Sequence, residues 1–400
     1  MLARSVAAGP HQAIKTASMY SISGYGKMIA DVTRMNAYVE AMRQVIRPNS
    51  VVLDLGTGPG LFALIACQLG ARLVYAVEPE NIIQLTRDAA VANGFVDRIV
   101  CLQSQSTSVT LPEYADVIVS DLRGVLPWFQ KHLPAILDAR KRLLGPGGKL
   151  IPARDTLWAA IVAVPECYSK LIAPWETNRF NLNLDSARRV VTNTWVKARI
   201  KPEQLLTEPT LWHILDYSQV AISDIAAQIC LSITCSGTAH GLAVWFDTEL
   251  LEGVGFSNHP REPELIYGQG FFPFPQPVEI AAGDSVSIEL RADLVLDDYI
   301  WSWRTVVCGH GETESVKAEF KQSTFLGALL SAAQLRKQAA SFVPELNEEG
   351  KRHALALSLM KGKISLQKIA EQLWERFPQT YADLKDALSD VSELSRKYSQ

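Results

Sequence analysis

Residues 51–62 read VVLDLGTGPGLF, a hydrophobic segment followed by three glycines at alternate positions and then by more apolar residues. The apolar and β-branched run predicts a strand buried on both faces, and the residues after Gly60 predict a helix. Gly56, Gly58 and Gly60 would let the backbone turn sharply and let a ligand approach without meeting a Cβ atom. The stretch therefore predicts the first strand, the binding loop and a helix of a parallel α/β sheet.

A carboxylate at the end of the next predicted strand extends this signature. Residues 73–77 are apolar and predict a strand, and Glu78 follows directly, 18 residues after Gly60. At the tip of the second strand of such a sheet, a carboxylate can accept hydrogen bonds from both hydroxyls of a ribose. The segment thus predicts a ligand that contains a nucleoside, and a glycine-rich turn without a ligand is the alternative.

The spacing of the glycines separates two classes of cofactor. Dinucleotide-binding proteins have the pattern G-x-G-x-x-G, which places a pyrophosphate at a helix N-terminus. Here the pattern is D-x-G-x-G-x-G, which begins at Asp54 and ends at Gly60. This form is typical of methyltransferases, in which the acidic residue reaches the cationic end of the ligand indirectly. We therefore predict S-adenosyl-L-methionine as the cofactor.

The composition of the chain narrows its class and its partners. Its 400 residues include 39 basic and 42 acidic side chains, carry a net charge of -3 and are 48% apolar. This length predicts two or three domains, and the apolar fraction excludes the disordered class. The near balance of charge predicts no nucleic-acid partner and no membrane partner. The sequence shows no secretory signal and no apolar run of about 18 residues, so we expect a cytoplasmic protein. It also contains no C-x-x-C pair, so we predict no bound metal.

The pattern of the sequence changes along the chain. Between residues 38 and 152, apolar runs alternate with helical patterns, which predicts a parallel α/β sheet. The predicted strands are 51–55, 73–77, 99–103 and 115–120, and the predicted helices are 61–69, 81–93 and 128–144. Residues 153–330 show the alternation typical of antiparallel strands, with a polar, helical insertion at about 176–210. Residues 335–400 predict a small helical domain.

Short landmarks in the same order resemble those of the protein arginine methyltransferase family over residues 19–325. They include MIADVTRMNAY at 28–38, LP at 111–112, DVIVS at 116–120, GPGGKLIP at 145–152 and HGLAVWFD at 240–247. The resemblance implies a Rossmann-like methyltransferase domain capped by residues 1–37, a β-barrel domain with a helical dimerisation arm, and a homodimer. It also implies that Arg34 pairs with the carboxylate of the cofactor and that Met28 lies near its sulfonium. The predicted cofactor-binding residues are Met28, Arg34, Asp54, Gly56, Thr57, Gly58, Gly60, Leu61, Glu78, Pro79, Gln105, Ser106, Thr107 and Asp121.

The predicted acceptor site departs from this family. Its members hold the substrate guanidinium between two glutamates of one loop, and the matching residues here are Asp121 and Gln130. Arg123 lies on the same loop, and Leu265-Ile266-Tyr267 stands where the family has a triplet that contains histidine. One carboxylate would compensate a buried guanidinium poorly, and Arg123 would repel it further. We assign the catalytic site to Asp121, Gln130 and Arg123, with Asp121 as the candidate base or orienting group.

Three interpretations of the activity follow from this site. The first is methyl transfer to a non-standard acceptor, on a peptide or protein, and a neutral or anionic acceptor would suit Arg123 and Gln130. The second is a protein arginine N-methyltransferase with a degenerate site. The third is a non-catalytic S-adenosylmethionine-binding protein that acts through its interactions.

The C-terminal segment carries a second resemblance. Residues 359–370, with Phe377-Pro378 and Asp390-Val391, resemble the small PqqD-type domain that binds leader peptides of ribosomally made natural products. This resemblance implies that the segment recruits a precursor peptide, one residue of which would be the methyl acceptor. A winged-helix fold and a plain helical cap over the barrel are the alternatives.

Overall fold

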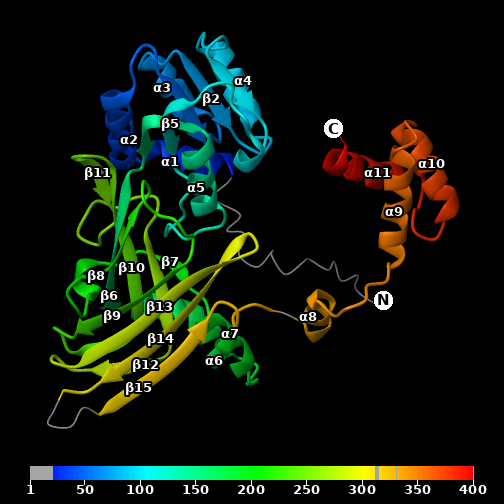
Figure 1. Cartoon of the computed structure of the whole chain (residues 1–400). Coiled ribbons are helices and arrows are strands. Elements are labelled where there is room, and N and C mark those ends of the chain that lie inside the picture. The colour runs from blue at the N-terminus through cyan, green and yellow to red at the C-terminus, as the bar shows by residue number, and fades with distance from the viewer. Residues whose placement is uncertain (1–20, 311–314, 330, 400) are drawn as a thin grey trace. The chain divides into compact units, whose positions relative to one another are not determined.

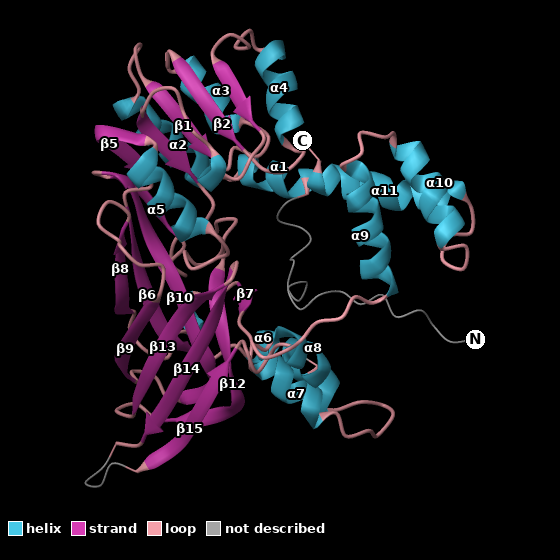
Figure 2. Ribbon diagram, turned by 45° about the vertical axis from the view of Figure 1, so that its right-hand side comes forward, coloured by secondary structure: helices cyan, strands magenta, loops and turns pink. Residues whose placement is uncertain are grey.

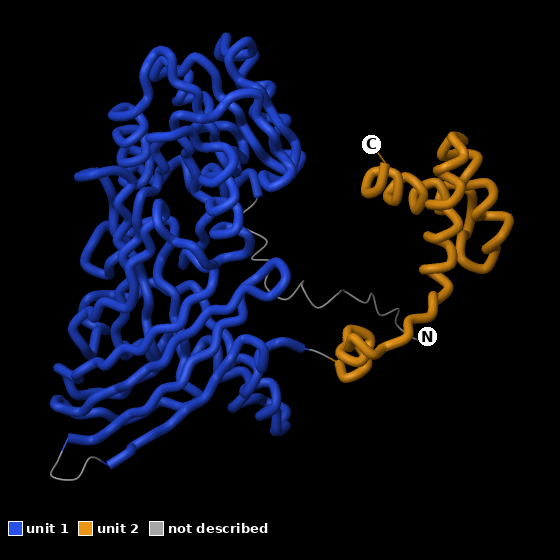
Figure 3. Tube along the Cα trace, in the orientation of Figure 1, with its two compact units in different colours: residues 1–329 blue, residues 330–400 orange. Residues whose placement is uncertain are grey.

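The computed structural model describes residues 21–310, 315–329 and 331–399, which form two compact units (Figures 1 and 3). The first unit extends to Leu329 and contains an α/β layer and an antiparallel β domain. The second begins at Leu330 and is helical. Most of the predicted N-terminal cap, together with the start of the chain where no signal was predicted, falls on residues 1–20, outside the described residues. No helix in the described part of the chain is long and apolar enough to cross a membrane.

A five-stranded parallel sheet forms the centre of the α/β layer (Figure 2). Its strands are β1 (Val51–Leu55), β2 (Leu73–Val77), β3 (Ile99–Leu102), β4 (Ala115–Ser120) and β5 (Leu144–Ile151). The helices of the layer are α1 (Ile22–Ala30), α2 (Val32–Val45), α3 (Leu61–Gln68), α4 (Ile83–Ala92) and α5 (His132–Arg142). A short 3₁₀ helix, η1 (Ser106–Ser108), lies between β3 and β4. The strand order is β3-β2-β1-β4-β5, so the direction of winding reverses between β1 and β4. Open α/β sheets bind ligands at the carboxyl ends of the strands at such a point.

The predicted parallel strands are confirmed, whereas the last predicted helix of the layer starts too early. Strands β1, β2 and β4 have the predicted bounds, and β1 is buried along its whole length, as an apolar central strand should be. Helix α5 begins at His132 instead of Trp128, because the Trp128 ring packs among buried aromatic side chains of the β domain. Its centroid lies 5.2 Å from that of Trp212 and 6.2 Å from that of Trp301.

Two antiparallel sheets with a common core build the β domain. The first sheet contains, in order, β7 (Val196–Ala198), β12 (Gln269–Ile280), β10 (Gly237–Leu251), β6 (Arg154–Val162) and β8 (Thr210–Asp216), and β11 (Val254–Ser257) pairs with β10. The second sheet contains, in order, β15 (Val316–Ser323), β14 (Asp298–Cys308), β13 (Ser285–Val295) and β9 (Ile225–Ser232). Strand β8 lies beside β9 and β12 beside β15, so the two sheets enclose one interior as in a barrel. Alternating burial along β14 places every second side chain in this interior.

The predicted insertion is less helical than its polar sequence suggested. Helix α6 (Pro165–Glu176) precedes it, and within it only α7 (Asp185–Thr192) and a short 3₁₀ turn, η2 (Pro202–Gln204), are helical. Residues 196–198 instead form β7, because they pair with β12 at the edge of the sheet. This edge strand carries a lysine, Lys197, to the site described below.

The second unit consists of α8 (Ala332–Gln338), α9 (Glu348–Met360), α10 (Leu366–Arg376) and α11 (Leu384–Tyr398). Its own small core contains Ala356, Ile369, Ala370, Leu373, Tyr381, Ala387, Val391 and Leu394. Ser365 caps α10, as its position before the amphipathic run predicts. Trp374 on the same helix is 41% exposed, so it lies outside this core. A winged helix requires strands, and residues 331–399 contain none, so that alternative is wrong.

Candidate active site

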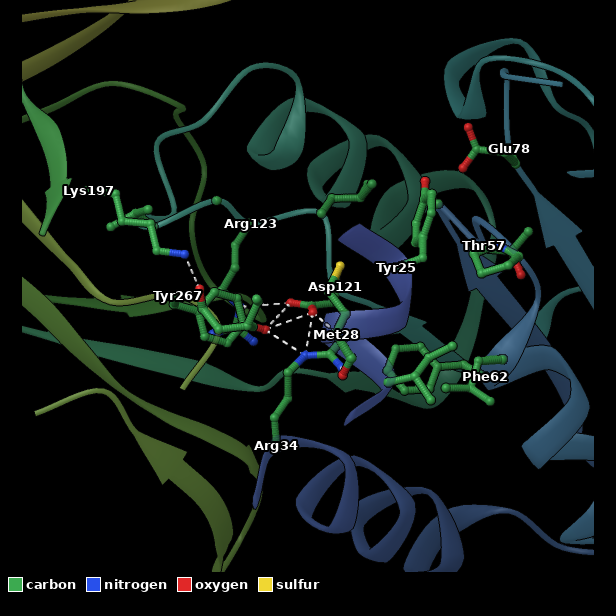
Figure 4. Close-up of a pocket in the computed structure, with 18 residues that line it drawn as sticks. Tyr25, Met28, Arg34, Thr57, Phe62, Glu78, Asp121, Arg123, Lys197 and Tyr267 are labelled. Carbon is green, nitrogen blue, oxygen red and sulfur yellow. Dashed lines mark hydrogen bonds and ion pairs between the residues drawn. The ribbon is translucent and has the colours of Figure 1, made fainter. Parts of the chain in front are cut away.

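A pocket lies at the carboxyl ends of β1 and β4, where the α/β layer meets the β domain of the first unit (Figure 4). Helix α1, the glycine loop after β1 and the loop after β4 form most of its wall. The β domain contributes Lys197, Ile266 and Tyr267. Glu78 lies at one end of the pocket in Figure 4, and Lys197 and Tyr267 lie at the other. We call the end at Glu78, where the sequence predicts a nucleoside, the nucleoside end, and the opposite end the acceptor end.

The glycine loop adopts a backbone conformation that few other residues could adopt. Gly56 and Gly58 have φ values of 77° and 53°, in the left-handed region. A Cβ atom on Gly58 would lie 2.7 Å from the ring of Tyr25, and one on Gly56 would lie 2.2 Å from Leu122. The glycines thus allow α1 and the loop after β4 to approach the binding loop closely.

Two buried carboxylates hold this loop in place. Asp54 accepts hydrogen bonds from the hydroxyl of Thr57 at 2.5 Å and from the amide of Ala63 at 2.9 Å, and burial raises its pKa to about 7. Glu78 accepts one bond at each oxygen, from the amides of Gly58 at 3.1 Å and of Glu80 at 3.0 Å. Burial also raises the pKa of Glu78. Each Glu78 oxygen retains a lone pair that can accept a ribose hydroxyl, which suits the predicted role.

Asp121 forms a tight cluster with Arg34 and Tyr267. The Nε atom of Arg34 donates to Oδ2 of Asp121 at 2.9 Å, and Nη2 of Arg34 forms an ion pair with the same oxygen. The Tyr267 hydroxyl lies 2.8 Å from Oδ1 and 2.7 Å from Oδ2. Burial alone would raise the pKa of Asp121, but the positive charges of Arg34 and of nearby Arg123 outweigh it and lower that pKa. The carboxylate is therefore ionised, with partners at both oxygens.

Arg123 lines the pocket near Asp121, and its guanidinium enters a buried ion pair. Its Nη1 atom lies 2.5 Å from Oδ1 of Asp155, and both side chains are fully buried. Thr248 and the hydroxyl of Tyr38, the latter at 3.1 Å, also bind the guanidinium, and Tyr217 donates to Asp155 at 2.6 Å. The expectation that Arg123 repels a cationic substrate is therefore wrong, because Asp155 compensates its charge. Arg34, Arg123, Asp121 and Asp155 together form a balanced set of two cations and two anions.

Several predicted residues lie outside the pocket. Gln130 is exposed with a φ of 44°, and its amide donates to Asp298 at 3.4 Å; it does not line the acceptor end. The chain turns inward before it to bury Leu126 and Trp128, and this turn removes Gln130 from the position that the family loop suggested. Gly58, Gly60, Pro79, Gln105, Ser106 and Thr107 are not among the lining residues either, although the two glycines shape the loop.

Eight of the other predicted residues line the pocket and Asp54 does not, and the structure adds lining residues that were not predicted to bind the cofactor or act in catalysis. The predicted residues found in the lining are Met28, Arg34, Gly56, Thr57, Leu61, Glu78, Asp121 and Arg123, and the added ones include Tyr25, Phe62, Lys197 and Tyr267. Phe62 follows the glycine loop directly, so its place on the first turn of α3 could have indicated it. No local signal marks Lys197 or Tyr267, because the β domain brings them to the site.

The residues present fit S-adenosylmethionine chemically. Glu78 offers acceptors to a ribose, and Arg34 would bind a carboxylate only through N–H groups that Asp121 does not use. The cavity measures about 100 Å³, whereas small-molecule sites usually measure about 300–1,000 Å³. Tyr25 of α1 packs against Gly58.

Comparisons with known proteins identify the family. Residues 153–304 match the arginine methyltransferase oligomerization subdomain, and residues 32–151 match the ribosomal protein L11 methyltransferase model. Protein arginine N-methyltransferase 6 of Xenopus tropicalis is 30% identical over 276 residues, which cover 65% of this chain and 80% of that protein. The chain belongs to the protein arginine N-methyltransferase family. It is thus a methyltransferase whose cofactor is S-adenosylmethionine, as the glycine pattern predicts.

Other members of the arginine methyltransferase family match to different extents. The arginine N(omega)-methyltransferase of Streptomyces achromogenes is 28% identical over 268 residues, covering 66% of this chain and 74% of that protein. A probable protein arginine N-methyltransferase 6 of Arabidopsis thaliana is 29% identical over 232 residues, and the match spans only 53% of its length and 56% of this chain. In fold, the chain is similar to the Trypanosoma brucei PRMT1 enzyme-prozyme complex, with a TM-score of 0.68 and 22% identity over 76% of this chain and 99% of that one.

Proposed function

We propose that this protein transfers a methyl group from S-adenosylmethionine to an acceptor other than a protein arginine side chain. The state of Asp121 carries the proposal. Asp121 and Glu78 are the acidic residues that line the pocket in the described part of the chain, and Glu78 lies at the nucleoside end. At the acceptor end, Asp121 already pairs with the cation Arg34 through Oδ2, and the hydroxyl of Tyr267 also binds the carboxylate. An incoming guanidinium would therefore find no carboxylate at this end whose charge is unpaired.

The charge balance supports the same conclusion. Two buried cations, Arg34 and Arg123, match two buried anions, Asp121 and Asp155, so the floor of the pocket has no excess negative charge. A guanidinium that leaves water without a counter-ion loses several kcal/mol of hydration free energy. A neutral or anionic acceptor avoids this loss. Alignment of such an acceptor with the cofactor supplies much of the rate of methyl transfer.

A methyl-labelling assay tests the proposed acceptor class. With labelled S-adenosylmethionine, the wild-type protein should leave an arginine-rich peptide at the background level of heat-inactivated protein. The Tyr267→Phe variant frees a position on Asp121 and should label that peptide more than the wild type does. Strong labelling of arginine by the wild-type protein would contradict the proposal and favour an arginine N-methyltransferase. Failure of the protein to bind S-adenosylhomocysteine in calorimetry would favour a non-catalytic role.

We also propose that the protein is a homodimer and that its second unit recruits a peptide acceptor. The match of residues 153–304 to an oligomerization subdomain supports the dimer, as do Phe180 and Leu182, which are 65% and 59% exposed between α6 and α7. The separate core of the second unit supports an independent recruiting function.

A truncated protein tests both proposals together. Without residues 341–400, the protein should remain a dimer in sedimentation velocity and bind S-adenosylhomocysteine as before, because neither the arm nor the pocket is changed. Methylation of a peptide acceptor should be lost, and that of a free small-molecule acceptor retained. Dissociation of the truncated protein, or undiminished peptide methylation, would contradict the corresponding proposal.

A further inference from the structure

We infer that the acceptor is a carboxylate, held by Lys197 at the wall of the pocket opposite the nucleoside end. This inference rests on the proposed function and specifies its substrate class. Lys197 lies on β7, lines the pocket and stands beside Tyr267 in Figure 4. Its ammonium group donates to the carbonyl oxygen of Ile266. An ammonium group has three N–H donors, so two are available to a ligand.

The charge of Lys197 is not matched by a carboxylate. Within residues 21–310, 315–329 and 331–399, no acidic side chain forms an ion pair with it, since nearby Glu264 pairs with Arg199 at 2.8 Å. Burial, together with the charges of Arg199 and Lys27, lowers the pKa of Lys197. An anion at this position would form an ion pair with the ammonium group of Lys197, which no carboxylate shares, whereas the same ammonium group would repel a guanidinium. Lys197 thus adds positive charge to a pocket floor that is otherwise balanced.

The groups in the described lining that could take a proton from an acceptor are Asp121, Glu78 and, in its neutral form, Lys197. Histidine and cysteine are absent from the lining among the described residues. Asp121 pairs with Arg34 and its pKa is lowered, which makes it a weak base, and each oxygen of Glu78 binds a backbone amide at the nucleoside end. A hydroxyl, thiol or ammonium acceptor must lose a proton to such a base, but a carboxylate has none to lose.

Methyl transfer to a carboxylate balances without a base. A lone pair of the carboxylate oxygen forms the new bond to the methyl carbon, and the carbon–sulfur bond breaks with its electron pair returning to sulfur. The products are a methyl ester and the neutral thioether S-adenosylhomocysteine. The negative charge of the acceptor and the positive charge of the sulfonium both disappear. The step therefore needs from the protein only the alignment that Lys197 and the pocket floor provide.

Small probe ions test this inference without turnover. Ligand-observed NMR of the S-adenosylhomocysteine complex should detect binding of acetate and not of methylguanidinium. Lys197→Met should weaken acetate binding at least tenfold, whereas Lys197→Arg should retain most of it. Lys201→Met, at an exposed lysine outside the pocket lining, is the matched control and should have no effect. Tighter binding of methylguanidinium, or acetate binding that is unchanged in Lys197→Met, would overturn the inference.

The methylated products show whether the carboxylate belongs to a peptide or to a small molecule. They also separate failure of this inference from failure of the proposed function. Labelled methyl groups transferred to the peptide or to the small-molecule fraction of a cell extract should be released as methanol by mild alkali, as methyl esters are. Alkali-stable label would refute the carboxylate and point to a base, such as neutral Lys197, acting on another acceptor. Absence of S-adenosylhomocysteine binding would instead refute the proposed function, so the two failures remain distinct.

Discussion

Replacement of Asp155 by alanine is expected to lower the free energy of unfolding by about 3–5 kcal/mol, because it leaves the buried charge of Arg123 uncompensated. Both side chains are fully buried, and the atoms that pair are 2.5 Å apart. The hydroxyls of Tyr217 and Thr248 lose their acceptor in the same variant. Urea denaturation followed by tryptophan fluorescence measures the effect in the first unit, which contains eight of the nine tryptophans.

Two further variants determine whether this loss comes from the charge pair. Arg123→Met/Asp155→Ala removes both charges and is expected to regain most of the stability, because neither partner then remains buried alone. Glu289→Ala interrupts an exposed pair with Arg304 and should change the free energy of unfolding by less than about 1 kcal/mol. If the double variant loses the sum of the two single losses, Arg123 and Asp155 are not coupled and this account of the pocket floor is wrong.

The parts of the fold that the sequence predicts are those governed by local pattern. Strand β1 and the glycine loop follow from an apolar run and from glycines that must take positive φ values, and Glu78 follows from its place after β2. These features need only neighbouring residues to form.

The acceptor end could not be predicted in the same way, because its contacts join distant positions. Asp121 meets Tyr267 146 residues later in the chain, and Arg123 meets Asp155 across 32 residues. Only the placement of the β domain against the α/β layer creates these pairs. The error at Gln130 has a related cause, since family loop spacing does not reveal that burial of Trp128 turns the backbone outward.

Glu78→Ala is expected to weaken the binding of S-adenosylhomocysteine by roughly 10²–10⁴-fold. The carboxylate offers one free lone pair on each oxygen to the two ribose hydroxyls, and a hydrogen bond to a charged group contributes about 1.5–3 kcal/mol. Loss of both bonds therefore removes about 3–6 kcal/mol of binding free energy. The variant also loses the acceptor of the Gly58 amide, so the glycine loop becomes less ordered. Isothermal titration calorimetry measures the dissociation constant directly.

The neighbouring acidic residue provides the matched control for this measurement. Glu80 is exposed, lies outside the pocket lining and contributes only its amide to Glu78, so Glu80→Ala should leave binding within about twofold of the wild type. Glu78→Gln keeps the shape of the side chain but offers one acceptor oxygen, and it should bind with intermediate affinity. Equal affinities for wild type and Glu78→Ala would mean that the ribose does not lie at the tip of β2. The assignment of a nucleoside end to this pocket would then fail. The placement of the acceptor at Lys197 would fail as well, because it assumes that the nucleoside lies at Glu78.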